Sequence, residues 1–323
     1  EQKMDAARIE EILLTQNTPD FFPPEEEWVH PHYGGLSIAN LPATIAALLG
    51  SDLPGALPPL PEQLWADWMP GLQRVVLVIL DALGYRMLRG MWARGEGKVF
   101  STLADAGCFF PLTSVFPSTT DAALVTLRTG RAPAEHGWLA YEMYLREYGI
   151  ATNAILLCPV WSSQRDMLVS WGLDPETLVP VPALAEHLAS QGIGTSGTLS
   201  AFFTNSGFTK MLYRGMTTIR GPIHASDLWV QLRHLVTEAR GSRAYITAYW
   251  SGLDTLGHAY GHDTDLWEAE FRSVSHLLER EFLDPMPAED REGTLLLITA
   301  DHGQLPVPLE HVLTASELSL IHI

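Results

Sequence analysis

Cysteine and positive charge are both scarce in this chain of 323 residues. Only two cysteines are present, Cys108 and Cys158, which excludes a disulfide-dense scaffold and is compatible with a reducing compartment. Lys and Arg number 20 against 38 Asp and Glu, so the net charge of −18 argues against a nucleic-acid duplex as a simple electrostatic partner. An anionic substrate would also be repelled, unless bound cations reverse the local field.

Long apolar stretches are missing as well. No run approaches the length of a membrane-spanning helix. Residues 1–20 contain acidic side chains and no apolar core of a signal peptide, which slightly favours the cytoplasm without fixing the location. The oligomeric state is not constrained by the sequence.

Three shorter apolar runs are present, and each leads to an aspartate. They are residues 75–80 before Asp81, residues 245–253 before Asp254, and residues 294–300 before Asp301. Continuous runs rich in Val, Ile and Leu are typical of strands buried on both faces of a parallel sheet. Because open α/β sheets bind ligands beyond the carboxyl ends of their strands, the pattern predicts one acidic cluster at that edge.

Helical patterns alternate with these runs, which indicates the α/β class. We expect an N-terminal helical and Pro-rich lead-in over residues 1–70, with a helix at about 5–15, packed on the core. Residues 71–323 would form the domain that carries the site, and residues 150–225 are the candidate for a cap insertion. Predicted core strands cover residues 74–80, 244–250 and 294–299, and predicted helices cover 121–128, 225–240 and 265–282.

Histidines accompany two of the three aspartates. Asp301 is followed directly by His302 and Gly303, and Asp254 is followed four positions later by His258. Carboxylates and imidazoles are ligands for divalent metals. The alternative for Asp81 is a helix N-cap, and for the Asp-His pair a cap beside a surface histidine.

The geometry of the Asp254 segment is open at this level. Residues four apart face the same way on a helical turn. Gly257 and Gly261 favour a bent loop instead, which could still direct Asp254 and His258 to one ion. His262 is a further candidate ligand in this segment, in competition with an ordinary polar turn.

Two hydroxyls, Thr119 and Thr120, precede the predicted helix at 121–128. Capping would explain both hydroxyls. The functional alternative uses the same geometry, because a helix N-terminus favours an anion such as phosphate. A hydroxyl there that is bound to a metal would become a nucleophile.

Taken in order, these segments resemble the alkaline phosphatase superfamily, in particular its type I phosphodiesterase and nucleotide pyrophosphatase branch. The resemblance rests on the strand ending at Asp81, residues 116–120 (Phe-Pro-Ser-Thr-Thr), residues 129–137 (Thr-Gly-Arg-Ala-Pro-Ala-Glu-His-Gly), the pair Asp254 and His258, and residues 300–303 (Ala-Asp-His-Gly). It implies a three-layer αβα sandwich with a central, mostly parallel sheet and a small insertion near the active site.

The resemblance also implies two divalent metal ions, usually zinc, with manganese as the alternative. One would be held by Asp81, Asp301, His302 and the nucleophile, and the other by Asp254, His258 and a further histidine. In this branch the nucleophilic threonine lies nine residues before the Thr of Thr-Gly, which points to Thr120, with Thr119 as the alternative.

Two positions depart from the family pattern. Tyr141 stands where the branch has an Asn that contacts the phosphoryl oxygen. The family's last metal-binding histidine lies well downstream of Asp-His-Gly, where this chain offers only His311 and His322. Either a C-terminal segment is missing or the second metal site is incomplete. His136, within a Pro-x-x-His-Gly pattern, is interpreted as structural.

The function that follows is a two-metal hydrolase of small-molecule phosphate esters or nucleotides, working through a phosphothreonine intermediate on Thr120. The alternatives are a phosphomonoesterase or phosphonate hydrolase of the same superfamily, and a non-catalytic metal-binding member. A sulfatase is disfavoured, because neither cysteine lies at the nucleophile position.

Overall fold

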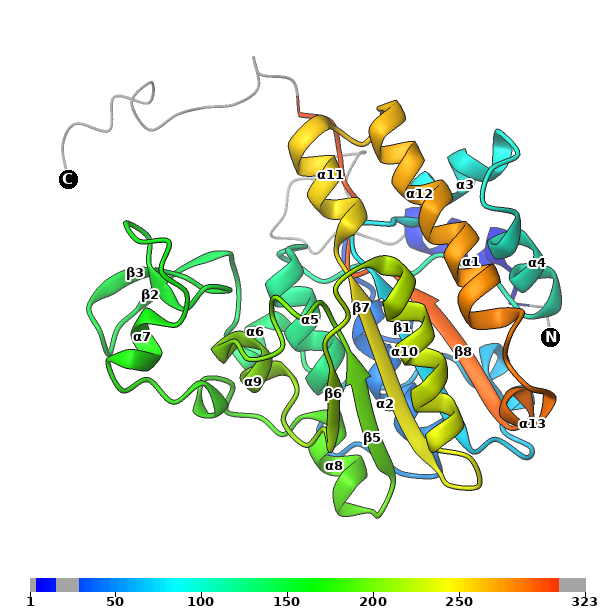
Figure 1. Ribbon diagram of the computed structural model, residues 1–323, viewed down its shortest axis with the longest axis horizontal. Helices are drawn as coiled ribbons and strands as arrows, with labels where there is room; N and C mark the ends of the chain where they lie inside the picture. The colour runs from blue at the N-terminus through cyan, green and yellow to red at the C-terminus, as the bar shows by residue number, and fades with distance from the viewer. Residues whose placement is uncertain (1–3, 16–28, 308–323) are drawn as a thin grey trace.

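A five-stranded sheet lies at the centre of the molecule (Figure 1), in a computed structural model that describes residues 4–15 and 29–307. All neighbouring strands run parallel. Their order is β6 (Thr218–Arg220), β5 (Gly194–Thr198), β7 (Ala244–Trp250), β1 (Arg74–Leu80) and β8 (Thr294–Thr299). The α/β class with a central parallel sheet is thereby confirmed.

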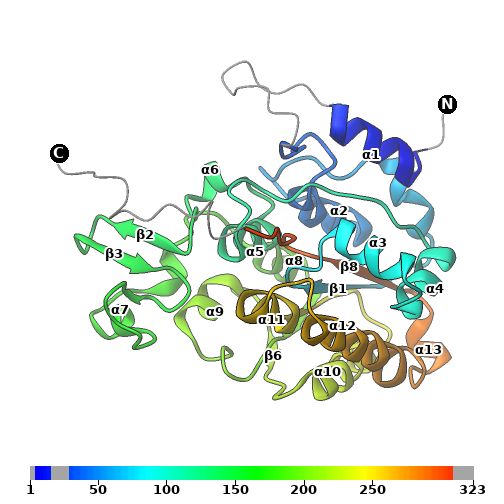
Figure 2. The same cartoon turned by 90° about the horizontal axis from the view of Figure 1, so that it is seen from above.

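The two faces of the sheet are buried by separate groups of helices, as Figure 2 shows from above. Alternate residues of β1 divide between the two cores: Val75 and Leu77 belong to one, and Val76 and Val78 to the other. The first core includes side chains of α2 (Leu41–Leu48), α5 (Thr120–Thr129) and α8 (Leu184–Ser190). The second includes those of α4 (Lys98–Ala106), α10 (Ala225–Glu238) and α12 (Asp265–Leu277). This period-two alternation explains why residues 75–80 of β1 are all apolar.

The N-terminal lead-in packs on the first of these cores. Helix α1 (Ala6–Thr15) buries Ile9 and Leu13 there, and matches the helix expected at about 5–15. The Pro- and Glu-rich segment at 23–27 lies outside the described residues.

The stretch expected to form a cap insertion divides into two parts. Its later portion supplies β5 and β6 of the main sheet, together with α9 (Gly207–Leu212). A separate antiparallel sheet of β2 (Glu142–Leu145), β3 (Ile150–Asn153) and β4 (Cys158–Pro159) lies to one side with α7 (Met167–Ser170) (Figure 1). The part outside the main sheet therefore begins before residue 150 and ends before β5.

The remaining elements connect these layers. They are η1 (Ile38–Asn40), η2 (Glu62–Leu64), η3 (Ala66–Trp68), α3 (Tyr85–Ala93), α6 (Pro133–His136), η4 (Pro175–Thr177), α11 (Gly252–Tyr260), η5 (Leu278–Leu283) and α13 (Ala288–Arg291). The helix expected over 265–282 is α12 continued by the π-helical η5. Within the described ranges, no helix combines the length and the apolar character needed to cross a bilayer.

Candidate active site

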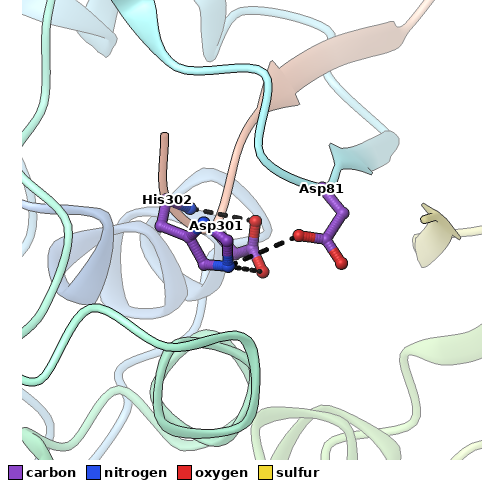
Figure 3. A group of neighbouring side chains, drawn as sticks. All are labelled: Asp81, Asp301 and His302. Carbon is purple, nitrogen blue, oxygen red and sulfur yellow. Dashed lines mark hydrogen bonds and ion pairs between the residues drawn. The ribbon is translucent and has the colours of Figure 1, made fainter. Parts of the chain in front are cut away.

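The carboxyl ends of neighbouring strands bring three predicted ligands together. Asp81 follows β1, while Asp301 and His302 follow β8, which pairs directly with β1. Figure 3 shows the three side chains converging from these two segments. Asp81 and Asp301 are buried, at 1% and 0% exposure.

The imidazole of His302 faces both carboxylates. Its Nε2 lies 3.5 Å from Oδ1 of Asp81 and 3.6 Å from Oδ2 of Asp301. Its Nδ1 lies 2.9 Å from the carbonyl oxygen of Gly303, which can only accept, so Nδ1 is the donor. In the neutral ring the lone pair is then on Nε2, directed at the two aspartates.

Two carboxylate oxygens at this point have no hydrogen-bond donor. Oδ1 of Asp81 and Oδ2 of Asp301 are both buried and unpartnered, whereas the other oxygen of Asp301 accepts the backbone N–H groups of Ala82 and His302. Each of the three residues offers one ligand atom, and these atoms lie within 4.8 Å of one another; this is the one such group among residues 4–15 and 29–307. Because buried carboxylates without a partner are costly, this donor set fits a divalent cation.

The local electrostatics also favour a cation. Burial raises the pKa of Asp81 well above its usual value, and the nearby charges of Asp301 and Asp254 raise it further. A hydrogen bond donated by the hydroxyl of Tyr249 partly offsets this effect. Without a metal, the cluster therefore resists full ionisation.

The predicted nucleophile lies beside this cluster. Thr120 is the first residue of α5, and its Oγ1 is 3.0 Å from Nε2 of His302. Thr119 is the N-cap residue, and its side chain does not cap the helix. The hydroxyl of Thr119 favours the ionised form of Asp121, whose pKa is nevertheless raised by burial. Of the two candidate nucleophiles, Thr120 is the one in contact with the cluster.

Asp254 and His258 lie on a regular helix, so the bent-loop interpretation of this segment is wrong. Both belong to α11, one turn apart, with Oδ1 of Asp254 3.4 Å from Nε2 of His258. Gly261, with φ 89°, terminates the helix instead of bending it. Gln304 donates to Oδ1 of Asp254 at 2.9 Å, which ties α11 to the segment after β8.

Two of the residues predicted for a second metal site, Asp254 and His258, lie next to each other on α11. The imidazole of His258 is 77% exposed, whereas Asp254 is 14% exposed and raises the pKa of Asp81. His262 lies beyond α11 with its Nδ1 2.9 Å from Asp263, and does not join the cluster. The two later histidines, His311 and His322, lie outside the described residues.

A cavity of about 180 Å³ extends from the cluster along α5. Its lining comprises Asp81, Thr120, Leu124, Arg128, Ile155, Leu199, Phe203, Phe208, Thr209, Leu212, Tyr213, Tyr249, Ser251, Asp254 and Thr255. Tyr141 is half-exposed and is not part of this lining.

Arg128 is a residue of this cavity that the sequence did not reveal, because an arginine near a helix end normally indicates a solvated face.

His136 is away from the cluster and is held by local hydrogen bonds. Its Nδ1 accepts the N–H of Trp138 at 3.1 Å, so Nε2 carries the proton and donates to Oγ1 of Thr126 at 3.0 Å. Burial lowers its pKa to about 4. A neutral, buried imidazole with both nitrogens satisfied supports the structural interpretation of this residue.

Comparison with known families agrees with this geometry. The sequence profile of the type I phosphodiesterase/nucleotide pyrophosphatase family matches residues 75–319. The chain belongs to this family. The resemblance inferred from the separated motifs, including membership of the alkaline phosphatase superfamily, is confirmed. No curated protein matches the chain.

Solved structures that resemble this chain are distant from it in sequence. Murine ectonucleotide pyrophosphatase/phosphodiesterase 5, as an inactive variant in complex with AMP, is 18% identical with a TM-score of 0.54, over 76% of this chain and 62% of that chain. The human protein of the same name is 18% identical with a TM-score of 0.50, over 72% of this chain and 57% of that chain. Phosphonoacetate hydrolase from Sinorhizobium meliloti 1021, in complex with phosphonoformate, is 16% identical with a TM-score of 0.49, over 72% of this chain and 57% of that chain. The chain therefore spans less than two thirds of each of these proteins.

The turn after β1, which contains Gly84, contacts the turn after β8 at Gly303. This contact leads to a first prediction. A Cβ at Gly84 would lie 2.9 Å from the Cα of Gly303, directly after the Asp-His pair. We expect Gly84→Ala to displace that turn and weaken zinc binding at least about tenfold, as measured by chelator competition. The control is Gly90→Ala, where nothing lies within 4 Å of the added methyl group. Unchanged zinc affinity in Gly84→Ala would contradict the proposed dependence on this contact.

Proposed function

We propose that this protein is a metal-dependent hydrolase of phosphate esters, acting as a phosphodiesterase or nucleotide pyrophosphatase through Thr120. The observation that carries the proposal is the position of the Thr120 hydroxyl. It lies at the N-terminus of α5, 3.0 Å from His302 and beside two buried, unpartnered carboxylate oxygens. We assign this activity to a domain of residues 71–323, with residues 1–70 as a lead-in of which helix α1 packs on the core.

The proposal assigns one divalent cation to Asp81, Asp301, His302 and Thr120, and a second to Asp254 and His258 with a further ligand. Zinc fits the mixed nitrogen and oxygen donors, and manganese is the alternative. When bound, such ions supply charge neutralisation and lower the pKa of a hydroxyl.

The chain's own groups perform the displacement as follows. The hydroxyl of Thr120 gives up its proton to solvent, and its oxygen attacks phosphorus in line. The bond from phosphorus to the leaving oxygen breaks, and that oxygen takes up a proton. The backbone N–H groups at the start of α5 favour the anionic phosphoryl group near Thr120. Water then hydrolyses the phosphothreonine, which returns the free hydroxyl.

Family membership supports this assignment, since the profile covers every segment that contributes to the cluster. The murine neighbour is described as an inactive variant in complex with AMP, which makes nucleotides reasonable first substrates to test here. The alternatives are a phosphomonoesterase, a phosphonate hydrolase or a metal-binding protein without activity.

A side-by-side assay separates these alternatives. We expect chelator-stripped protein to be inactive, and zinc or manganese to restore hydrolysis of bis-para-nitrophenyl phosphate in preference to para-nitrophenyl phosphate. Preference for the monoester would favour the phosphomonoesterase. Absence of metal-dependent turnover of either compound, and of a panel of nucleotides and phosphonates, would overturn the proposal.

A further inference from the structure

Arg128 is a buried cation in the wall of the cavity. It is 3% exposed, and three hydroxyls accept its hydrogen bonds. Nη1 donates to Tyr245 at 3.1 Å and Thr247 at 3.0 Å, and Nη2 donates to Tyr213 at 2.9 Å. Nε is buried without any partner. A guanidinium has five N–H groups, so its donor capacity is not exhausted.

Among the described residues, no carboxylate lies against this charge and Arg128 forms no ion pair. Burial lowers the pKa of its guanidinium, but Tyr213 and Tyr245 raise it by more, so the net shift is upward. The other fully buried arginine, Arg74, differs: its Nη2 donates to the carbonyl oxygens of Asp290 and Glu292, and the charge of Asp290 stabilises it. Hydroxyls and the ring of Tyr213, 4.5 Å from the guanidinium carbon, stabilise the charge of Arg128 but do not neutralise it. Because buried charges are normally paired, this arrangement leaves room for an anionic ligand as the counterion.

The position of Arg128 relative to the nucleophile specifies that ligand. Thr120, Leu124 and Arg128 follow one another at intervals of four residues on α5, and all three line the same cavity. Eight residues of helix span about 12 Å.

The lining of the cavity combines acidic, apolar and basic side chains. Thr120 and the carboxylates Asp81 and Asp254 mark the place where a phosphoryl group would react, and Leu124 lies on α5 between Thr120 and Arg128. Arg128 is the one basic residue in the lining. Such a site fits a molecule with an anionic group at each end and a short apolar connection between them.

We propose that Arg128 binds a second anionic group of the substrate, a carboxylate or a second phosphoryl group, at the far end of this cavity. The substrate would then be a phosphate ester whose organic part carries this anion. The inference rests on the proposed function for the position of the phosphoryl group, and extends it by naming the substrate class.

The test is a comparison of ligands on zinc-loaded wild-type protein. Alkylphosphonates of two to six methylene groups, ending in a carboxylate, a carboxamide or a second phosphonate, are titrated by calorimetry. We expect at one chain length a dissociation constant at least about tenfold lower for an anionic end than for the carboxamide, as for other charge-assisted contacts. The carboxylate and bisphosphonate arms show which anion is preferred.

Substitutions then assign the effect to one residue. Arg128→Met should bring the ratio of carboxamide to carboxylate dissociation constants close to one, and Arg128→Lys should restore part of it. Arg131→Met is the matched control, because Arg131 is three positions away, pairs with Glu135 and does not line the cavity. It should keep the wild-type ratio.

The outcomes separate this inference from the function on which it rests. Equal affinity for the charged and uncharged ends at every length would overturn the role of Arg128 and leave the phosphoryl site intact. Failure of all the phosphonates to bind zinc-loaded protein would overturn the phosphoryl site, and the inference with it. Neither result requires Arg128→Met to fold.

Discussion

Replacing Thr120 with alanine is expected to lower kcat for bis-para-nitrophenyl phosphate by about 10⁴-fold or more, which is the scale on which a lost nucleophile acts. The hydroxyl is the group in contact with His302, and no other hydroxyl of the 116–120 segment has this contact. Zinc binding should largely survive in Thr120→Ala, because Asp81, Asp301 and His302 remain. Steady-state kinetics and metal content measured on the same preparation provide the test.

Thr119→Ala is the matched control for this change. The Thr119 side chain accepts no capping hydrogen bond from α5, so its loss should change kcat by less than about tenfold. If Thr119→Ala were inactive and Thr120→Ala active, the nucleophile would be Thr119. Undiminished turnover by both variants would exclude attack by either threonine.

Replacing Asp81 with asparagine should abolish turnover and yet stabilise the metal-free protein. Asp81 is 1% exposed, one of its oxygens has no partner, and Asp301 and Asp254 add like charge. Removing that buried charge should raise the free energy of unfolding by about 1–3 kcal/mol after chelator treatment. Urea unfolding with and without zinc would show wild type gaining stability from the metal and Asp81→Asn losing that gain.

The stabilisation of metal-free protein by Asp81→Asn should increase as pH rises. Because the folded-state pKa of Asp81 is raised, folded protein holds a proton that unfolded protein releases above its ordinary carboxyl pKa of about 4. The contribution of Asp81 to the stability of metal-free protein is therefore complete below that pH and is lost as pH rises. The advantage of Asp81→Asn should grow from pH 4 toward neutrality.

Asp290 supplies the control, because its pKa is shifted in the opposite direction. Arg240 donates to Asp290 at 2.7 Å and lowers the pKa of that carboxyl, so its stabilisation is present at neutral pH and is lost on acidification. Asp290→Asn should consequently destabilise the protein, with the largest loss at neutral pH. If Asp81→Asn behaved like Asp290→Asn in metal-free protein, the buried like-charge cluster would not be the source of strain.

The strands that could be predicted are those whose burial leaves a signature in composition. β1, β7 and β8 consist mostly of apolar side chains, and the predicted boundaries agree with the structure to within a residue. β5 reads Gly-Thr-Ser-Gly-Thr and has no apolar pattern. Its Gly197 is required by space, since a Cβ there would meet the ring of Tyr213 at 2.8 Å. Close packing of other side chains onto a bare backbone cannot be inferred from the local sequence.

The convergence of the cluster was predictable for a topological reason. Asp81, Asp301 and His302 follow directly on neighbouring parallel strands, so the end of the sheet brings them together. Asp254 was harder to place, because it lies four residues beyond the end of β7 and inside α11. The assignment of roles to these residues stays a prediction for the variants above.

Arg128 shows where single-sequence reasoning fails. Its environment consists of Tyr213, Tyr245 and Thr247, which lie 85 to 119 positions away and carry no recognisable motif. A buried, unpaired cation is defined by what surrounds it, so only the folded structure could reveal it.

The hydrogen bond between Ala82 and Asp301 joins positions 219 residues apart. A polypeptide leaves the ribosome N-terminus first, so Asp81, Thr120 and Asp254 are all synthesised before the last strand described, β8. A nascent chain at that stage has one of the three clustered ligands and cannot yet chelate the ion they would share. If these residues bind the proposed ion, binding must follow the synthesis of β8 and its pairing with β1.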